Sequence, residues 1–274
     1  MRNTSRWQWL PSAVAYFFKS TLLLWLLSLL YIIAGEGRRD LWPVLAGCVF
    51  YEAANLTLKV CSLKDPNFVN IAVSLLHSTV TSTSVMVVLL CEWMDKGAGK
   101  MFDHKELFSG IWSGAFKALC FSCGYFAYDQ WDMLDNHLYN PWAPSILVHH
   151  ALLLICFTLA LYRHVTINYL ILTLVCELHS IFLHLRRVLR MLGLRTEKNL
   201  RTKIEWGLHW LAFFSARVFV HWFITYKLIK DSSKFPHGIE LPLAFLGMVG
   251  MNVLNYFLGI DLVKACQKEL IKSS

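Results

Sequence analysis

Charged residues are scarce in this sequence. Asp, Glu, Lys and Arg make up 16% of the 274 residues, while 56% are hydrophobic, whereas a soluble domain averages about 25% charged residues. The apolar residues gather in runs of about 18 or more, the length needed to cross a hydrocarbon core of roughly 30 Å. The shortage of charge therefore excludes an ordinary soluble domain and indicates an all-α, polytopic membrane protein.

Several signatures of soluble enzymes and metalloproteins are also missing. The sequence has no Gly-rich phosphate loop, no GxSxG elbow and no HExxH helix, and it lacks the histidine clusters of membrane di-iron desaturases. Cys120 and Cys123 have CxxC spacing, but no second pair follows. We therefore expect no metal site and no cofactor. Most of the eight cysteines lie in or beside apolar segments, which is typical of small buried side chains rather than of a disulfide framework.

The net charge of +8 does not indicate nucleic-acid binding, because the basic residues stand in the connections between apolar runs, above all in residues 186–203. Such clusters mark cytoplasmic loops that face anionic lipid headgroups. We expect Arg186, Arg187 and Arg190 to contact these headgroups. The Lys and Arg distribution also places the 186–206 loop and the C-terminus in the cytosol.

The apolar runs predict seven or eight membrane spans. The first is read as a retained anchor, because it is too long for the core of a signal peptide. The second contains Glu52, Asn55 and Lys59 and is the weakest. We divide the chain into residues 1–65, with the anchor and the second segment, and a membrane domain over 66–274. The segments lie at about 14–34, 41–61, 68–91, 107–127, 146–162, 165–190, 207–229 and 241–264.

Ionisable residues inside these segments are candidates for a functional site. Each costs about 2.5–3.5 kcal/mol on insertion scales, so it faces the interior of the bundle by default. At about 1.5 Å of rise per residue, most of them fall in the cytosolic half, with Asp129 at the end of its segment. The candidates are His77, Asp129, His149, His150, Glu177, His184 and Arg217, with Asn252 and Asn255 as weaker members.

One helix carries three of the polar groups on one face. Glu177, Ser180 and His184 follow i, i+3, i+7 spacing, which places them together, whereas His179 is expected to point elsewhere. Structural alternatives exist for these residues. Glu177 and Arg217 could neutralise one another, and a single membrane histidine often only joins two helices by a hydrogen bond. The aspartates from Asp129 on could be a solvated helix end.

Two kinds of chemistry fit this set. A histidine near a carboxylate at the cytosolic face suits general base catalysis of acyl transfer from a soluble thioester to a lipid. For that reaction His149, His150, Glu177 and Asp129 are the catalytic candidates. The same groups suit binding of a polar lipid headgroup, with a cavity formed by His77, Ser180, His184, Arg217, Asn252 and Asn255.

Five stretches of the sequence resemble the TLC-domain superfamily, which includes the ceramide synthases. Together they cover almost all of residues 66–264, and the closest likeness is to the subgroup of TLC domain-containing proteins 1 and 2. In that subgroup a double histidine begins one helix, and an E-x-x-S-x-F-L-H-L-R pattern follows. The stretches are "NIAVSLLHSTVTS", "GYFAYDQWDML", "SILVHHALLLICFTLALY", "ELHSIFLHLRRVLRM" and "FFSARVFVHWF".

The resemblance implies a six-helix barrel around a cavity open to the cytosol, preceded by one or two additional helices. His149 and His150 match the double histidine of the ceramide synthase active site, and Glu177 stands near the first aspartate of the following helix. Ser180 and His184 replace the second acidic position and its neighbours, which argues against ceramide synthesis. The likeness to subgroup 1 and 2 implies a role in phospholipid acyl composition, and so in lipid homeostasis, membrane organization and membrane fluidity.

Three functions are therefore kept open. The first is a protein that regulates phospholipid acyl composition by binding lipid in the cavity. The second is an acyltransferase that uses acyl-CoA as co-substrate and a lysophospholipid or a sphingoid-type acceptor. The third is a membrane scaffold or a regulator of a channel or transport protein. Membrane lipids are the expected partners, and a homodimer is left open. The plasma membrane is favoured over the endoplasmic reticulum, because Lys272 lacks the second lysine of a retrieval signal.

Overall fold

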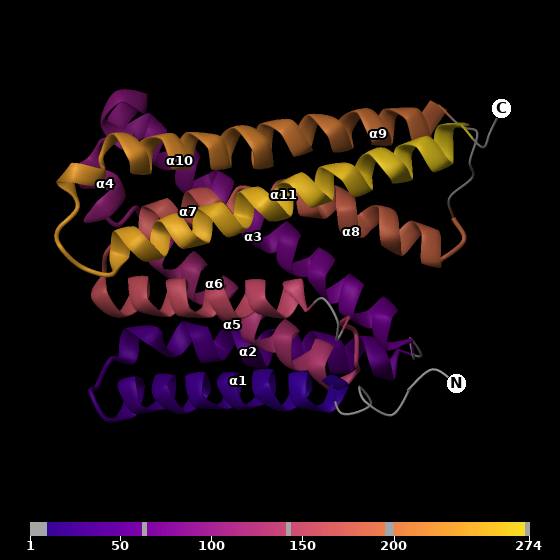
Figure 1. Cartoon of the computed structure of the whole chain (residues 1–274), viewed down its shortest axis with the longest axis horizontal. Coiled ribbons are helices and arrows are strands. Elements are labelled where there is room, and N and C mark those ends of the chain that lie inside the picture. The colour runs from indigo at the N-terminus through magenta and orange to yellow at the C-terminus, as the bar shows by residue number, and fades with distance from the viewer. Residues whose placement is uncertain (1–9, 62–64, 141–143, 195–199, 272–274) are drawn as a thin grey trace, which may run out of the picture. The chain divides into compact units, whose positions relative to one another are not determined.

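The computed structural model describes residues 10–61, 65–140, 144–194 and 200–271, and all regular structure in these ranges is helical (Figure 1). Lys272 and its neighbours at the C-terminus lie outside the described residues. The helices are α1 (Leu10–Ala34), η2 (Arg39–Leu41), α2 (Trp42–Val60), α3 (Pro66–Met101), α4 (His104–Phe108), α5 (Ala115–Asp135), α6 (Ser145–Arg163), α7 (Ile167–Leu174), α8 (Glu177–Met191), α9 (Leu200–Ala212), the π-helical segment η3 (Phe213–Phe219), α10 (Val220–Lys230), η4 (Ser232–Lys234) and α11 (Glu240–Ile271).

Six stretches of the described residues are long and apolar enough to cross a membrane, which confirms the prediction of an all-α, polytopic membrane protein. The weakest predicted segment is among them, as η2 and α2. The other two predicted segments are helical as well, as α5 and as the run from α9 through η3 to α10. The barrel arrangement stays a prediction. The six stretches are Ser12–Ala34, Arg39–Val60, Pro66–Met101, Ser145–Arg163, Ile167–Met191 and Glu240–Glu269.

The predicted bounds of the fourth segment were wrong. Residues 107–127 are not one helix, because α4 ends at Phe108 and α5 begins only at Ala115. Between them Gly114 has a φ of 81°, a left-handed conformation that breaks a helix. Because α5 extends to Asp135, Asp129 lies inside this helix and not at its end.

By their contacts the residues form two compact units. The first takes Met1–Asn70 and Cys120–Leu159, and the second takes Ile71–Leu119 and Ala160–Ser274. Helix α3 therefore begins in the first unit and continues in the second. The predicted boundary at residue 65 stays a prediction, and the compact units divide the chain differently, since most of α5 and α6 groups with α1 and α2.

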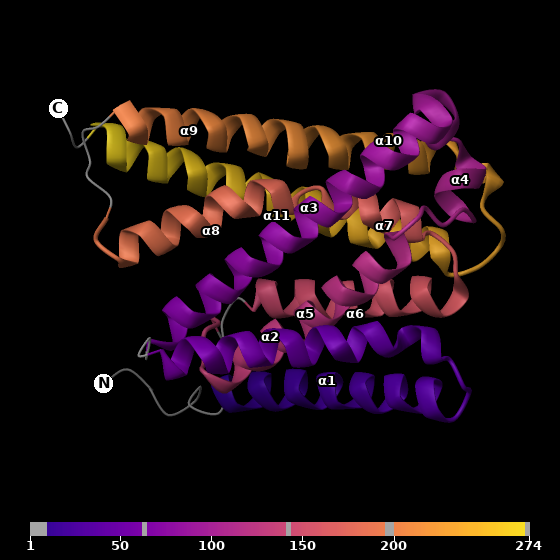
Figure 2. The same ribbon diagram turned by 180° about the vertical axis from the view of Figure 1, so that it is seen from behind.

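In the first unit α1 and α2 run antiparallel beside each other (Figure 2). Helices α2 and α5 cross at two glycines. A Cβ on Gly124 would overlap the carbonyl oxygen of Val44, and a Cβ on Gly47 would lie 2.8 Å from the Phe121 carbonyl oxygen. Such close backbone approach admits only glycine, and it brings the polar residues of α2 and α5 within hydrogen-bond reach.

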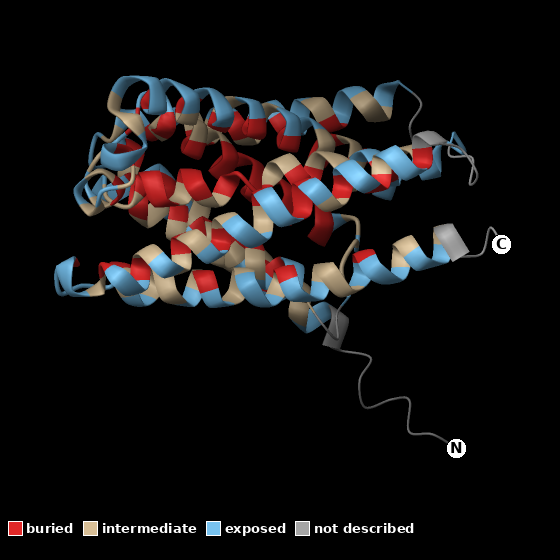
Figure 3. Ribbon diagram, turned by 90° about the horizontal axis from the view of Figure 1, so that it is seen from above, coloured by how far each residue is buried: buried red, intermediate tan, exposed pale blue. Residues whose placement is uncertain are grey.

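In the second unit α8 packs against α9, and α10 packs against α11. An apolar cluster of Trp206, Phe213 and Leu262 joins α9, η3 and α11. Individual helices carry both buried and exposed residues (Figure 3), with 56% of the most apolar window of α7 and α8 buried but only 17% of that of α11. Helix α11 therefore presents most of its surface outward, whereas the α7–α8 run is more buried, and α8 itself contributes buried His179, Ser180 and Arg186.

Candidate functional site

The first unit holds two buried aspartates in its polar centre. Asp129 and Asp132 of α5 are each 5% exposed. Asn70 Nδ2 donates to Asp129 Oδ1 at 2.7 Å and to Asp132 Oδ2 at 2.9 Å. Asn55 Nδ2 donates to Asp132 Oδ1 at 3.0 Å and to the Tyr128 hydroxyl at 2.6 Å. Amide donors therefore hold both carboxylates, so this centre gathers negative charge.

His150 completes the centre of the first unit. Its Nε2 lies 3.6 Å from Asp129 Oδ2, and the side chain is 5% exposed. Its Nδ1 is buried and has no hydrogen-bond partner in the described residues. His149 is less buried, with its ring 5.6 Å from that of His150. A carboxylate on one imidazole nitrogen and a free second nitrogen form the arrangement of a histidine base with its orienting acid.

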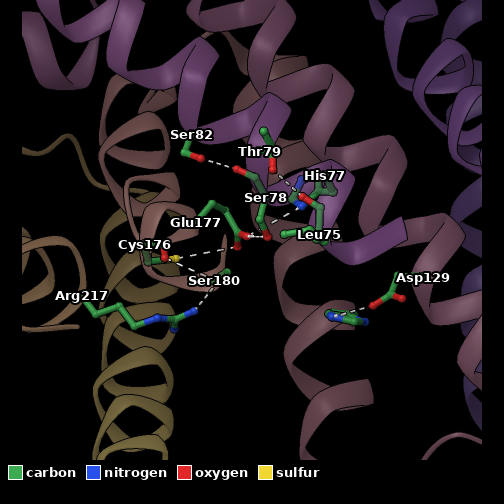
Figure 4. A network of polar contacts seen from close by, with 11 residues as sticks. Leu75, His77, Ser78, Thr79, Ser82, Asp129, Cys176, Glu177, Ser180 and Arg217 are labelled. Carbon is green, nitrogen blue, oxygen red and sulfur yellow. Dashed lines mark hydrogen bonds and ion pairs between the residues drawn. The ribbon is translucent and has the colours of Figure 1, made fainter. Parts of the chain in front are cut away.

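Glu177 anchors the polar centre of the second unit. It is the first residue of α8, directly after the two helical residues that connect α7 to α8. Ser78 Oγ donates to Glu177 Oε2 at 2.6 Å, and His77 Nδ1 lies 3.8 Å from the same oxygen (Figure 4). Both partners come from α3, so Glu177 joins α8 to α3 through a polar contact inside the membrane helices.

Arg217 lies in the π-helical segment η3 and donates to three neutral acceptors. Its Nε donates to His179 Nδ1 at 2.9 Å, one terminal nitrogen to Ser180 Oγ at 2.7 Å, and the other to Asn255 Oδ1 at 3.3 Å. Within the described residues no carboxylate lies at ion-pair distance from it. Among these residues Arg217 is therefore a cation without a carboxylate partner in a π-helical segment. Because π-helical turns occur often at functional sites, Arg217 is a candidate functional residue of the second unit.

The tautomers of two histidines beside Arg217 follow from their hydrogen bonds. His179 Nδ1 accepts from Arg217, so its proton is on Nε2. His221 Nδ1 lies 2.7 Å from the Arg217 carbonyl oxygen and donates to it, which leaves Nε2 as an acceptor. Both Nε2 atoms are buried without a hydrogen-bond partner in the described part of the chain, as are His184 Nδ1 and Asn255 Nδ2. The surroundings of Arg217 therefore hold unused polar groups of both kinds.

The predicted site residues fall into two groups, one in each unit. Asp129, His149 and His150 belong to the first unit. The second unit contains the others, which are His77, Glu177, Ser180, His184, Arg217, Asn252 and Asn255. In that group Ser180 and Asn255 contact Arg217, whereas Asn252 is exposed and donates to Thr225 at 3.2 Å.

Two expectations about α8 need correction. His179 does not point away from the polar residues, because it is fully buried and accepts a hydrogen bond from Arg217. Arg186 is not exposed to headgroups, because its side chain is 6% exposed and pairs with Glu269 at 2.5 Å. Its guanidinium also lies 4.6 Å from the centre of the Trp206 ring. Headgroup contact stays a prediction for Arg187 and Arg190.

The suggested pairing of Glu177 with Arg217 takes an indirect form. Arg217 donates to Ser180, Ser180 Oγ lies 3.5 Å from the Cys176 carbonyl oxygen, and Cys176 Sγ lies 3.9 Å from Glu177 Oε1 (Figure 4). Each charged group is thus held by its own neutral partners. The two charges do not form a direct ion pair in the described residues.

Sequence reasoning missed His209 and His221 of the second unit and Asn70 of the first. His209 is 1% exposed, and its ring lies 4.6 Å from that of His179. A signal existed in the sequence, because His209, Arg217 and His221 lie at multiples of four residues. That spacing drifts around an α-helix of 3.6 residues per turn, but a π-helical segment keeps it on one face.

No group of three or more potential metal ligands occurs among the residues that the structure describes. Cys120 and Cys123 are buried free thiols. The polar centres therefore present a histidine–aspartate pair in one unit and an arginine with neutral partners in the other.

These features define a polytopic helical membrane protein with ionisable centres inside its helices. Residues 67–264 match the TLC domain, described as TRAM_LAG1_CLN8, and the chain belongs to this family. It is 27% identical to TLC domain-containing protein 2 of Danio rerio over 74% of this chain and 80% of the relative. It is 26% identical to TLC domain-containing protein 1 of Mus musculus over 79% of this chain and 87% of the relative. No solved structure matches.

Proposed function

We propose that this protein binds a membrane phospholipid in its second unit and thereby regulates the acyl composition of membrane phospholipids. The observation that carries the proposal is Arg217, a cation in the helical run from α9 to α10 whose described partners are all neutral. Membership of the TLC family supports a lipid-related role. The subgroup resemblance supports acyl composition as the quantity that is regulated.

A phosphate group fits the surroundings of Arg217. A buried charge is stable only with a partner of opposite charge or with hydrogen bonds, and guanidinium binds phosphate oxygens through a planar fork. His179 Nε2–H and the Asn255 amide add unused donors beside it. Together these groups supply several N–H donors to one anion, which is the chemistry of phosphate recognition.

The central test is the amount of phospholipid that copurifies with the full chain. Arg217→Gln is expected to remove the phospholipid held at Arg217, so that the amount of phospholipid bound per chain falls below that of the wild type, as measured by mass spectrometry of extracted lipid. Arg39→Gln, a change at an exposed arginine of η2, is the matched control and should retain the lipid. In cells, the same Arg217 variant should change the share of polyunsaturated chains in phospholipids.

A second variant separates lipid loss from misfolding. Asn255→Asp keeps the shape of the side chain and gives Arg217 an internal carboxylate in place of the Asn255 Oδ1 acceptor at 3.3 Å. It should displace the lipid phosphate while the protein stays folded. Full retention of phospholipid in Asn255→Asp would contradict the proposal.

An acyltransferase is the second candidate function, favoured by the His150–Asp129 pair. In this reaction His150 Nδ1 takes the proton of an acceptor hydroxyl, and the oxygen attacks the thioester carbonyl of acyl-CoA. The carbon–sulfur bond then breaks, and the released thiolate takes up the proton. Asp129 orients the imidazole and stabilises its charged form.

Labelled acyl-CoA with lysophospholipid or sphingoid base tests this candidate directly. Transfer that is lost in His150→Gln and in Asp129→Asn, but kept in His137→Asn, would establish the enzyme. His137 is an exposed histidine after α5 and serves as the control. No turnover together with copurified phospholipid would leave lipid binding as the function.

The plasma membrane is the proposed location of this multi-pass protein, with the endoplasmic reticulum as the alternative. Membrane phospholipids are its proposed partners, and acyl-CoA would be a co-substrate only for the enzyme. Imaging of a tagged full chain beside markers of both membranes would decide between the two locations.

A further inference from the structure

The first unit contains an apolar groove on the surface of α1, α2 and α5. Its volume is about 500 Å³, within the roughly 300–1,000 Å³ of sites for single small ligands. Helix α1 and the η2–α2 run are candidate membrane spans, so the groove opens toward lipid. It is lined by Leu22, Leu23, Trp25, Leu26, Cys48, Val49, Glu52, Ala53, Leu56, Ala127, Tyr128 and Trp131.

Glu52 is the exception in this apolar lining. It stands eight residues before the end of α2, or roughly 12 Å along the helix. It is exposed, and among the described residues no cation lies at ion-pair distance from it. An ionisable group inside a span is costly, so it indicates a function by default. A ligand with a positive group or a hydrogen-bond donor would satisfy this carboxylate.

A cation and an aromatic ring stand beside the same groove. Lys19 Nζ lies 5.2 Å from the centre of the Trp131 ring and 3.5 Å from Asp135 Oδ1. This ion pair is exposed, with side-chain exposures of 36% and 60%, so it holds Lys19 only weakly. Trp131 is itself 48% exposed and lines the groove. Tryptophan and lysine are typical anchors at the level of lipid headgroups.

We infer that this groove binds one zwitterionic phospholipid, with an acyl chain along its apolar lining and the headgroup ammonium at Glu52. Lys19 lies beside the phosphate of the same headgroup. The charge pattern argues for this lipid class. The carboxylate of Glu52 lines the apolar groove, and the weakly held ammonium of Lys19 lies beside it. An anionic lipid without an ammonium group would leave Glu52 unpaired, and a sterol would leave Lys19 unused.

The groove is independent of the Arg217 centre. Its lining comes from α1, α2 and α5 of the first unit, and α1 and α2 precede the matched domain at residues 67–264. The groove therefore adds a lipid contact to the helices in front of that domain. Testing it in an Arg217→Gln background removes any phospholipid held at Arg217 from the measurement.

The experiment measures lipid retained by the full chain after transfer from vesicles of phosphatidylcholine, phosphatidylglycerol and cholesterol. In the Arg217→Gln background, Glu52→Gln should lower the ratio of phosphatidylcholine to phosphatidylglycerol at least fivefold. Ala53→Phe should fill the groove and lower both retained phospholipids. Glu36→Gln, at an exposed glutamate after α1, is the matched control and should leave the ratio unchanged.

Three results would overturn the inference. An unchanged lipid ratio in Glu52→Gln would remove the role of the carboxylate. Cholesterol that is lost only in Ala53→Phe would make the groove a sterol site. A dimer that Ala53→Phe converts to a monomer, as measured by mass photometry, would make the groove an interface between two copies of the chain.

Discussion

The polar centre of the first unit is built on two carboxyl groups, whereas the second unit holds a guanidinium, that of Arg217, apart from its own carboxyl group, Glu177. In the first, Asp129 and Asp132 accept hydrogen bonds from asparagine amides. In the second, Arg217 donates to neutral acceptors, of which His179 is the most buried. Asp132 and Arg217 are each held through neutral side chains, whereas Asp129 and Glu177 each have a histidine nearby, His150 and His77.

This difference determines which ion each centre can bind, a proton in the first unit or an anion in the second. A carboxylate pair with amide donors and an adjacent imidazole can hold or move a proton, because the imidazole retains one free nitrogen. A guanidinium without a carboxylate can take an anion. The second unit also contains a completed pair, Arg186 with Glu269, so its two arginines form an internal comparison.

The largest effect is expected where that completed pair is broken. Glu269→Gln should lower the free energy of unfolding by about 3 kcal/mol, since it leaves the buried Arg186 charge without its partner. Glu269 also accepts a hydrogen bond from Trp206 Nε1 at 3.1 Å. Thermal denaturation in a mild detergent would measure the loss.

Arg217→Leu provides the matched change at the other arginine. We expect it to cost less than Glu269→Gln, because it removes a charge together with three hydrogen bonds and strands no opposite charge. An equal or larger loss in Arg217→Leu would mean that Arg217 has a strong internal counter-charge, and the comparison between the two arginines would fail.

In the first unit, Asp132→Ala should lower the free energy of unfolding by about 2 kcal/mol. The change removes the acceptor for Asn55, Asn70 and Asn136 and leaves buried amide donors unsatisfied. Asp135→Ala on the same helix is the control. Its carboxylate is 60% exposed, so its loss should be small in the same denaturation experiment.

Hydrophobic runs predict most of the helices of this chain but not their ends. Residues 107–127 are predominantly apolar, and hydropathy does not register that Gly114 adopts a positive φ. Because hydropathy does not detect this break, it predicts a helix that ends near residue 127, and Asp129 then falls at a helix end rather than within α5. Residues 120–159 belong to the first unit, in which α5 packs closely against α2 at Gly47 and Gly124. This contact joins residues far apart in the sequence, so no local pattern predicts it.

The sequence predicts a set of candidate polar residues, but not how the structure divides them between the two units. Helical spacing assigns Glu177, Ser180 and His184 to one face, yet α8 has polar partners on two sides. Glu177 meets α3 and His179 meets η3, so residues on different faces are both polar contacts. The π-helical segment changes the angular position of Arg217 and His221, and a periodicity of 3.6 does not anticipate that change.

A carboxylate placed beside Arg217 should raise the free energy of unfolding, whereas the substitutions described above lower it. Asn255→Asp is expected to raise the free energy of unfolding of lipid-free protein by about 1 kcal/mol, because its carboxylate would pair with Arg217. The measurement is thermal denaturation after delipidation. A lower stability of the variant would show that Arg217 already has a partner of opposite charge. The comparison between the two units would then be wrong.

The smallest effect is expected for an ion pair outside the spans. Asp231 follows α10 and forms ion pairs with Lys227 Nζ at 2.8 Å and with Lys234 Nζ at 2.7 Å. Burial raises the pKa of this carboxyl, but the hydrogen bonds from the two lysines outweigh burial, so its pKa lies below the usual range. A lowered pKa stabilises the fold above the unfolded value of about 3.9, and this contribution is lost as the pH falls through the folded pKa.

Asp231→Asn should therefore lower stability at pH 7, by less than about 1 kcal/mol because the amide oxygen of asparagine still accepts a hydrogen bond. The gap between wild type and variant should narrow as the pH falls from 4 toward the lowered pKa, because protonation then removes the same charge from the wild-type protein. Unfolding temperatures of both proteins across this range measure the gap. A pH-independent gap would show that Asp231 acts through packing alone. A narrowing gap would place it with Arg186 and Glu269 as a completed pair, in contrast to Arg217.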